Sequence, residues 1–253
     1  MRRLATSLLI AVFITAQLSC TRKPSTVPQA ESTSTPTEQA AIDQILQHYE
    51  QALGGKEAIE GITSERMKGT FQIGGMVGKI EGWTKEPNKT LVAIEFPRIG
   101  ILKKGFDGEA RWVQTPAGTF ENSNPQEIAE LDRDAEVYSP GKIKALFESM
   151  KLDNKARLNG REMYVIEGKP NRGPAEKLFF DVENGLLVRW DMARRQEGRG
   201  TVFVKVHLED YKDVGNLKAP FKIRFAFESF TFLVQVDELE YNIPIDDAIF
   251  KKP

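Results

Sequence analysis

The sequence predicts a mainly β fold in which one large, twisted antiparallel sheet forms an unclosed half-barrel with helices on its concave face. Two patterns support a sheet with helices. From Met67 onwards, apolar and polar residues alternate along successive segments separated by turn-forming pairs, which is the two-residue period of half-buried strands. Stretches with helical spacing precede and interrupt this series. Strands linked by short turns form antiparallel, strongly twisted sheets. The half-barrel itself follows from a family resemblance described below.

The N-terminus has the features of a secretory signal peptide. Two arginines precede an apolar run over residues 4–14, and small and polar residues follow. The run is too short to span a bilayer as a mature helix. The one cysteine of the chain, Cys20, stands at the expected cleavage position and resembles the lipidated cysteine of bacterial lipoproteins. Gln17 and Leu18 depart from that motif, so ordinary cleavage after Ala16 is the alternative.

The segment after Cys20 is rich in Ser, Thr and Pro and has almost no large apolar residue, so it cannot bury enough surface to fold. We therefore expect a signal peptide over residues 1–19, a flexible tether over 20–37 and a folded domain over 38–253. A lipidated Cys20 would hold this domain at the periplasmic face of the cell envelope. By the rule for bacterial lipoproteins, Thr21 after the cysteine favours the outer membrane.

The folded part begins with an amphipathic helix. A capping pattern starts at Thr35, and apolar residues recur at helical spacing until Gly54-Gly55 ends the run. Three further helices are expected over residues 56–62, 124–131 and 139–150. Strands are expected over residues 67–73, 76–86, 89–96, 110–115, 162–169, 201–211, 220–228 and 231–241, and in a hairpin over 177–192.

The hairpin is predicted from Asn184-Gly185, which favours a two-residue type I′ turn between two apolar runs. This turn would place Phe179 opposite Trp190. Because both faces would carry large apolar residues, we expect both to be covered over part of their length. The predicted faces are Phe179, Val188 and Trp190 on one side, and Phe180, Val182 and Leu187 on the other.

Seven phrases in a fixed order resemble one protein family. They are ILQHYEQALGGKEAIEGI, MKGTF, PNKTLVAIEF, GFDGEARWVQTP, FFDVENGLLVRW, LEDYKDVGNLKAPFKIRF and VDELEYNIPIDDAIFKKP. Over residues 41–253 this order is similar to that of bacterial envelope proteins of the outer-membrane lipoprotein-sorting, or LolA-like, type. The resemblance implies an unclosed β-barrel whose apolar concave side is lidded by helices and binds acyl chains or lipoproteins.

The leading functional hypothesis is a non-catalytic envelope lipoprotein that binds an acyl chain or a lipoprotein tail in this cavity. The alternative is an accessory module that docks onto another envelope protein without lipid cargo, and an enzyme is third. From the alternation of apolar residues, we expect ten side chains to line or plug the cavity, together with the apolar side of the first helix. The ten are Val92, Ile94, Phe96, Phe221, Ile223, Phe225, Phe227, Phe232, Val234 and Val236.

An arginine-rich stretch beside Trp190 is the other candidate site. It is either a solvated loop or a contact for lipid phosphate or an acidic partner, for which guanidinium groups are suited. Its members are Arg189, Arg194, Arg195 and Arg199.

Composition argues against several other functions. The formal charge is -1, which excludes a basic nucleic-acid binder on overall charge. With His48 and His207 as the only histidines and one cysteine, a His-rich metal site cannot be assembled. No metal or cofactor is therefore expected. The carboxylates that could serve in acid–base catalysis are expected to be structural, because none has a partner base or metal. They are Asp107, Asp181, Glu183, Asp246 and Asp247.

Overall fold

The computed structural model describes residues 36–121, 140–171, 173–196 and 200–253. Within these ranges the chain forms thirteen strands, with helices before the first strand, between β6 and β7, and after the last strand. The elements are α1 (Pro36–Ala52), α2 (Lys56–Glu60), β1 (Ser64–Ile73), β2 (Met76–Lys85), β3 (Lys89–Phe96), β4 (Gly100–Phe106), β5 (Arg111–Thr115), β6 (Gly118–Glu121), η1 (Pro140–Leu146), β7 (Ser149–Leu158), β8 (Arg161–Lys169), β9 (Glu176–Asp181), β10 (Leu187–Gln196), β11 (Gly200–Val214), β12 (Leu217–Phe227), β13 (Thr231–Tyr241) and η2 (Asp247–Phe250).

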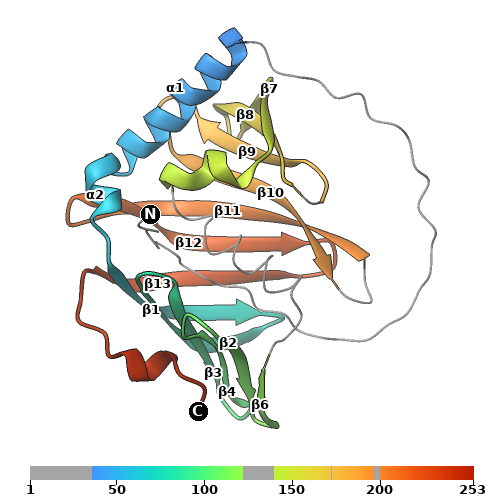
Figure 1. The fold of residues 1–253 in the computed structure, drawn as a ribbon. Coiled ribbons are helices and arrows are strands. Elements are labelled where there is room, and N and C mark those ends of the chain that lie inside the picture. Colours follow the sequence, from blue (N-terminus) through green and yellow to red (C-terminus); the bar gives the residue numbers. More distant parts are fainter. Residues whose placement is uncertain (1–35, 122–139, 172, 197–199) are drawn as a thin grey trace.

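All thirteen strands belong to one antiparallel sheet in the order β6-β5-β4-β3-β2-β1-β13-β12-β11-β10-β9-β8-β7. The first and last strands of the chain, β1 and β13, pair in the interior of the sheet. Strands β6 and β7 form the two edges and do not pair with each other, so the curved sheet is not closed (Figure 1). The predicted fold class, an unclosed half-barrel with helices on one face, is confirmed.

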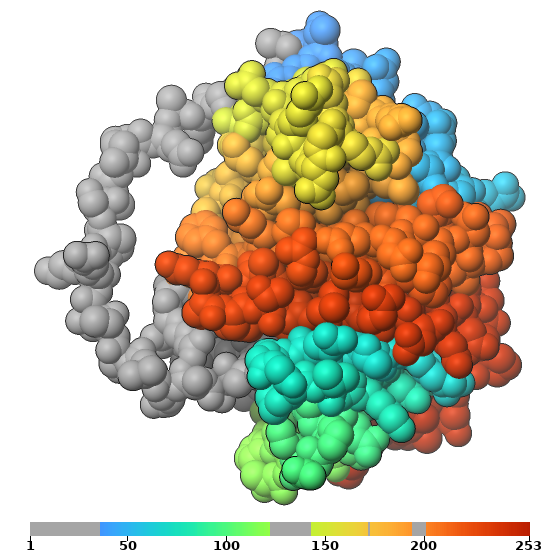
Figure 2. Space-filling model, turned by 180° about the vertical axis from the view of Figure 1, so that it is seen from behind, coloured from blue at the N-terminus to red at the C-terminus, as the bar shows by residue number. Residues whose placement is uncertain are grey.

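Helix α1 covers the face that we call the inner face. Its buried residues recur at helical spacing, and Tyr49 packs against Phe180 of β9 with ring centroids 5.4 Å apart. The C-terminal end of α1 is tied to β12, because the Lys218 amide donates to the Leu53 carbonyl at 2.9 Å. From behind, the strands cover most of the molecule and the helix shows only at its margin (Figure 2). The short η2 lies elsewhere, where Trp112 Nε1 donates to the Phe250 carbonyl at 2.8 Å.

Two predicted helical segments have different outcomes. The helix expected over 139–150 is wrong in its second half, since η1 ends at Leu146 and β7 begins at Ser149. The reason is tertiary: β7 pairs with β8 along its length, and its amide at Leu152 donates to Glu38 of α1 at 2.7 Å. The helix expected over 124–131 lies outside the described residues. Strands β4, β6 and β7 were not predicted, because short or charged segments hide the two-residue period.

The predicted hairpin forms, but its turn and register are wrong. Strand β9 ends at Asp181 and β10 begins at Leu187, with Trp190 opposite Leu178 and a register shift near Leu187. Gly185 has a φ of 74°, yet the connection is a five-residue loop rather than a two-residue turn. Asp181 causes this, because its Oδ1 accepts the Glu183 and Asn184 amides at 2.9 and 3.3 Å. Such side-chain bonds compete with the backbone pairing of a tight turn.

The changed register moves Trp190 to the inner face. There it joins the main core with Phe180 and Leu187, whereas Phe179 packs on the outer face in a small cluster with Val188 nearby. Both faces of the hairpin are thus covered over part of their length, as expected. Helix α1 accounts for part of the inner cover, since a Cβ added at Gly185 would lie 2.8 Å from Cγ of His48.

Candidate ligand-binding surface

All ten residues nominated for the cavity lie in or against the main hydrophobic core of the inner face. Seven are buried there, and Val92, Phe96 and Phe227 are partly buried against it. They share this face because β2, β3, β12 and β13 pair in register with one another or with β1. Their role in binding a ligand stays a prediction.

Six phenylalanine rings form a continuous series on this face. Phe225 stacks on Phe232 at 4.4 Å between centroids, and Phe227 stacks on Phe230 at 4.4 Å. Phe227 and Phe232 are 5.8 Å apart, which joins the two pairs. Phe71 extends the series, since its ring centroid lies 5.2 Å from that of Phe232. Phe96 follows, with its centroid 5.8 Å from that of Phe71.

The aromatic series reaches the surface at one end of the sheet, which we call the open end. This end carries the β1–β2, β3–β4 and β12–β13 turns. Phe230, in the last of these turns, is 37% exposed. Because soluble proteins rarely gather large apolar groups at the surface, this end is a candidate contact site. Four other large apolar residues are exposed there: Met76, Val77, Ile99 and Ile101.

The opposite end, which we call the helix end, holds a partly open pocket under α1 and α2. It has a volume of about 70 Å³ and walls contributed mainly by apolar side chains, including Leu53, Ile59 and Leu239. One acidic residue, Glu65 at the start of β1, also lines it and is only 4% exposed. An acidic side chain this deeply buried is rare without a partner.

Strand pairing places Glu65 in the pocket. Glu65 lies opposite Tyr241 on β13 and Thr84 on β2, and directly opposed residues share a face of the sheet. Glu65 also lies two residues before the fully buried Met67 on β1, so the two side chains point to the same face of the sheet. The alternation of apolar residues could therefore have identified Glu65 as inward-facing. Sequence reasoning missed it because the predicted strand began at Met67.

Glu65 has no hydrogen-bond or ion-pair partner in the part of the chain that the structure describes. Burial raises the pKa of its carboxyl to about 7. The Tyr211 hydroxyl donates to the Leu187 carbonyl at 2.7 Å. Burial raises the pKa of the Tyr49 hydroxyl, and its interaction with Tyr211 opposes this shift.

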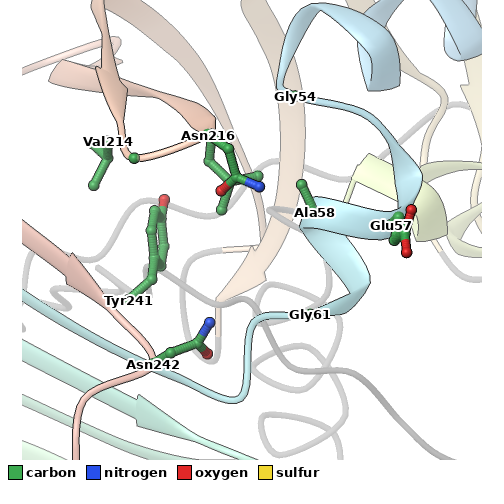
Figure 3. A pocket seen from close by; sticks show the side chains of 10 residues that line it. Gly54, Glu57, Ala58, Gly61, Val214, Asn216, Tyr241 and Asn242 are labelled. Atoms are coloured by element: carbon green, nitrogen blue, oxygen red, sulfur yellow. The ribbon is translucent and has the colours of Figure 1, made fainter.

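Tyr241 and Leu217 line both this pocket and a neighbouring open cleft of about 660 Å³. In Figure 3 the Tyr241 side chain rises from β13 toward the β11–β12 turn at Asn216, with α2 on the other side of the cleft. The cleft has polar walls that include Glu57 and Asn242. Burial and the nearby Glu65 raise the pKa of the Tyr241 hydroxyl, which stays protonated.

The arginine-rich stretch is only partly described. Arg189 forms an ion pair with Asp191 and lies over the ring of Phe179 with its guanidinium carbon 4.5 Å from the centroid. Its charge is thus balanced within the outer face. Arg194 and Arg195 belong to β10, but their side chains lie outside the described part, as does Arg199. Their proposed contact with lipid or a partner stays a prediction.

The histidines have surroundings that suit structural roles. His207 lies on the outer face opposite Arg189 and Arg224. Partial burial, followed by these two arginines, lowers the pKa of its imidazole, which is therefore neutral at pH 7. His48 packs over the Gly185 loop. In the described ranges no three metal-ligating side chains gather to hold an ion.

Each carboxylate nominated from the sequence has a partner that suits a structural role. Asp107 accepts the amides of the turn after β4, and this lowers the pKa of its carboxyl. Asp246 accepts the Ala248 amide at 2.9 Å as the N-cap of η2. Asp247 pairs with lysines on β2 and β3. Glu183 forms an ion pair with Arg161 at 3.3 Å. Arg161 also forms an ion pair with Asp181 at 2.9 Å, although the geometry of this second contact is not that of a hydrogen bond.

Solved structures resemble this fold at low sequence identity. A DUF1329 family protein from Desulfovibrio piger has a TM-score of 0.59 and 14% identity, covering 86% of this chain and 98% of that one. A domain from Vibrio parahaemolyticus, described as an outer membrane lipoprotein-sorting protein, has a TM-score of 0.54 and 11% identity, covering 82% of this chain and 96% of that one. A LolA superfamily protein from Nitrosomonas europaea has a TM-score of 0.53 and 13% identity, covering 83% of this chain and 97% of that one.

These likenesses show that the chain has a LolA-like fold, which agrees with the resemblance found in the sequence. No protein-family model and no curated protein matches the sequence. Among the residues described, no helix has both the length and the apolar character needed to span a bilayer.

Proposed function

We propose that the protein is an exported, non-catalytic carrier that holds an acyl chain or a lipoprotein tail against the inner face of the half-barrel. The observation that carries this proposal is the aromatic series, which runs from exposed Phe230 to buried Phe71 with neighbouring ring centroids 4.4 to 5.8 Å apart. The LolA-like fold supports it as an analogy. The envelope is the proposed location, with the N-terminus as the export signal.

An acyl chain suits this surface on energetic grounds. Each CH₂ group moved from water into apolar surroundings gains about 0.8 kcal/mol. The partly exposed rings of Phe96 and Phe227 offer contact at the open end without unfolding the buried core. The gain must exceed the cost of ordering the chain. Affinity should therefore rise with chain length until the ligand extends beyond the aromatic series.

Fluorescent fatty-acid titration of delipidated protein tests the proposal. Phe227→Asp places a charge in the aromatic series, whereas Phe203→Asp makes the same change at a 65% exposed position on the outer face. We expect saturable micromolar binding by the wild type, a loss of at least tenfold in Phe227→Asp and no change in Phe203→Asp. Circular dichroism must show that both variants fold. Equal loss in both variants, or no binding by the folded wild type, would contradict the carrier.

The alternative is a docking module without lipid cargo. The exposed apolar residues at the open end favour it, because such a patch also suits a protein partner. Ile101→Asp should then abolish a complex isolated from envelope extracts, while delipidated protein binds no fatty acid. Under the carrier proposal the titration is positive, so the two outcomes separate the functions.

Anchoring at Cys20 is proposed separately, since this residue lies outside the described ranges. If Cys20 is lipidated, the wild type should be in the membrane fraction and Cys20→Ser should be released or remain an uncleaved precursor. Stable anchoring needs more than one acyl chain. A soluble wild type whose mature N-terminus is Gln17 would contradict lipidation. It would not affect the proposed carrier function.

A further inference from the structure

The pocket at the helix end has a composition that the carrier function does not require. An acyl carrier needs an apolar surface, yet this pocket places a carboxyl group with no partner against apolar walls. Among the described residues, the one other charged residue that lines it is Lys218, whose ammonium group lies 2.5 Å from Asp213. Lys218 alternates with the inward-facing Leu217 and Ala219, both buried, so its side chain points to the other face of the sheet. Within the described residues, no lining group supplies a positive charge to Glu65.

We propose that this pocket binds a small primary amine, with the ammonium group against Glu65 and the alkyl chain against the apolar walls. An ammonium donates hydrogen bonds to a carboxylate, and charged pairs of this kind are about twice as strong as neutral ones. The aromatic ring of Tyr241, which lies opposite Glu65, offers a further favourable contact for a cation. The proposal does not rest on the carrier function.

The size and access of the pocket define the ligand further. A volume of about 70 Å³ gives room for roughly five water-sized groups, which corresponds to an amine with about four carbons. The pocket is itself partly open to solvent, and the cleft on the other side of Tyr241 has polar walls. The groups that face Glu65 are Tyr49 from α1, Tyr211 from β11, Tyr241 from β13 and Thr84 from β2. None of them is a cation.

The ionisation of Glu65 makes amine binding depend on pH. With a carboxyl pKa of about 7, the group is mostly ionised at pH 8 and mostly neutral at pH 5.5, where a small amine remains protonated. The tyrosines are neutral throughout this range because burial raises the pKa of Tyr49 and of Tyr241. The affinity for the amine should therefore be at least about tenfold higher at pH 8 than at pH 5.5.

The test is an NMR titration of the purified protein with butylamine, butanol and butyrate at pH 8. These probes share an alkyl chain and differ in charge. We expect butylamine to bind at least tenfold more tightly than butanol, with chemical-shift changes at Glu65 and Tyr241. Glu65→Gln should reduce butylamine to the affinity of butanol. The matched control is Glu240→Gln, which alters an outer-face carboxylate beside Tyr241 that lies 3.8 Å from Arg66, and it should change nothing.

Three results would overturn the proposal: equal binding of butanol and butylamine, preference for butyrate, or butylamine affinity in the wild type that does not change between pH 5.5 and 8. Failure of the folded wild type to bind butylamine would overturn it as well. The pH comparison uses the wild type, so it decides the question even if Glu65→Gln does not fold. None of these results affects the fatty-acid titration at the open end.

Discussion

Three carboxyl groups are deeply buried in the described part of the chain, those of Glu65, Glu176 and Asp181, and two of them have contrasting surroundings. Asp181, in the β9–β10 hairpin, is 1% exposed and accepts two loop amides while it pairs with Arg161. Glu65, at the helix end of β1, is nearly as buried but has no partner in the described part of the chain. A partnered buried carboxylate organises local structure, whereas one without a partner destabilises the fold unless it is neutralised or meets a ligand. The comparison therefore separates a structural carboxylate from a candidate binding group.

The largest effect is expected from Gly185→Val in the hairpin. The backbone at Gly185 has positive φ, and a Cβ there would lie 2.8 Å from His48. Strain and the contact with α1 together should lower the free energy of unfolding by about 4 kcal/mol in urea denaturation. The matched control is Gly215→Val, which also has positive φ but has no atom near its Cβ. It should cost only about 1 to 2 kcal/mol, and equal losses would show that α1 does not press on the loop.

Asp181→Ala should have the next largest effect. The change leaves the Glu183 and Asn184 amides without their acceptor and removes the ion pair with Arg161. We expect a loss of about 3 kcal/mol in the free energy of unfolding, from the usual cost of orphaned polar groups. Thermal or urea unfolding measures it. A loss below about 1 kcal/mol would show that the loop does not depend on its buried carboxylate.

Glu65→Gln should increase stability at high pH, in contrast to the losses expected from the two changes above. Because the folded state raises the pKa of Glu65 from 4.5 to about 7, it binds more protons than the unfolded chain between these values. Wild-type stability therefore falls as pH rises through this window, by about 2 to 3 kcal/mol. Glu65→Gln should remove this contribution, which makes the variant more stable than the wild type at pH 8. Urea unfolding at pH 4.5 and pH 8 measures the difference, and parallel pH curves for both proteins would contradict it.

The smallest effect is expected from Glu183→Gln. This side chain is in the same loop as Asp181 but is largely exposed, and its ion pair with Arg161 is at the surface. Exposed pairs contribute little, so the stability should change by less than about 0.5 kcal/mol. Ligand binding should not change either. Loss of fatty-acid binding with unchanged thermal stability would show that the hairpin has a direct functional role.

Part of the fold and of the candidate site followed from local patterns. The first helix was predictable because its apolar spacing and the glycines after Leu53 act within a few residues. Most strands were predictable because their alternation reflects one buried face. The same alternation identified the ten residues predicted for the cavity, which all lie in or against the core of the inner face. The hairpin register was not predictable from Asn184-Gly185, because the Asp181 side chain competes with the tight turn through bonds whose geometry only the folded loop provides.

The sequence by itself determined most of the strand segments, which side chains point inward along most of them and that the sheet has a LolA-like form. Only the tertiary structure decided that β1 and β13 pair in the interior of the sheet. That pairing brings Glu65 opposite Tyr241, from positions 176 residues apart by their numbers. The physical reason is that alternation records burial along one strand, whereas the partner of a buried carboxyl depends on which distant strands pair with it.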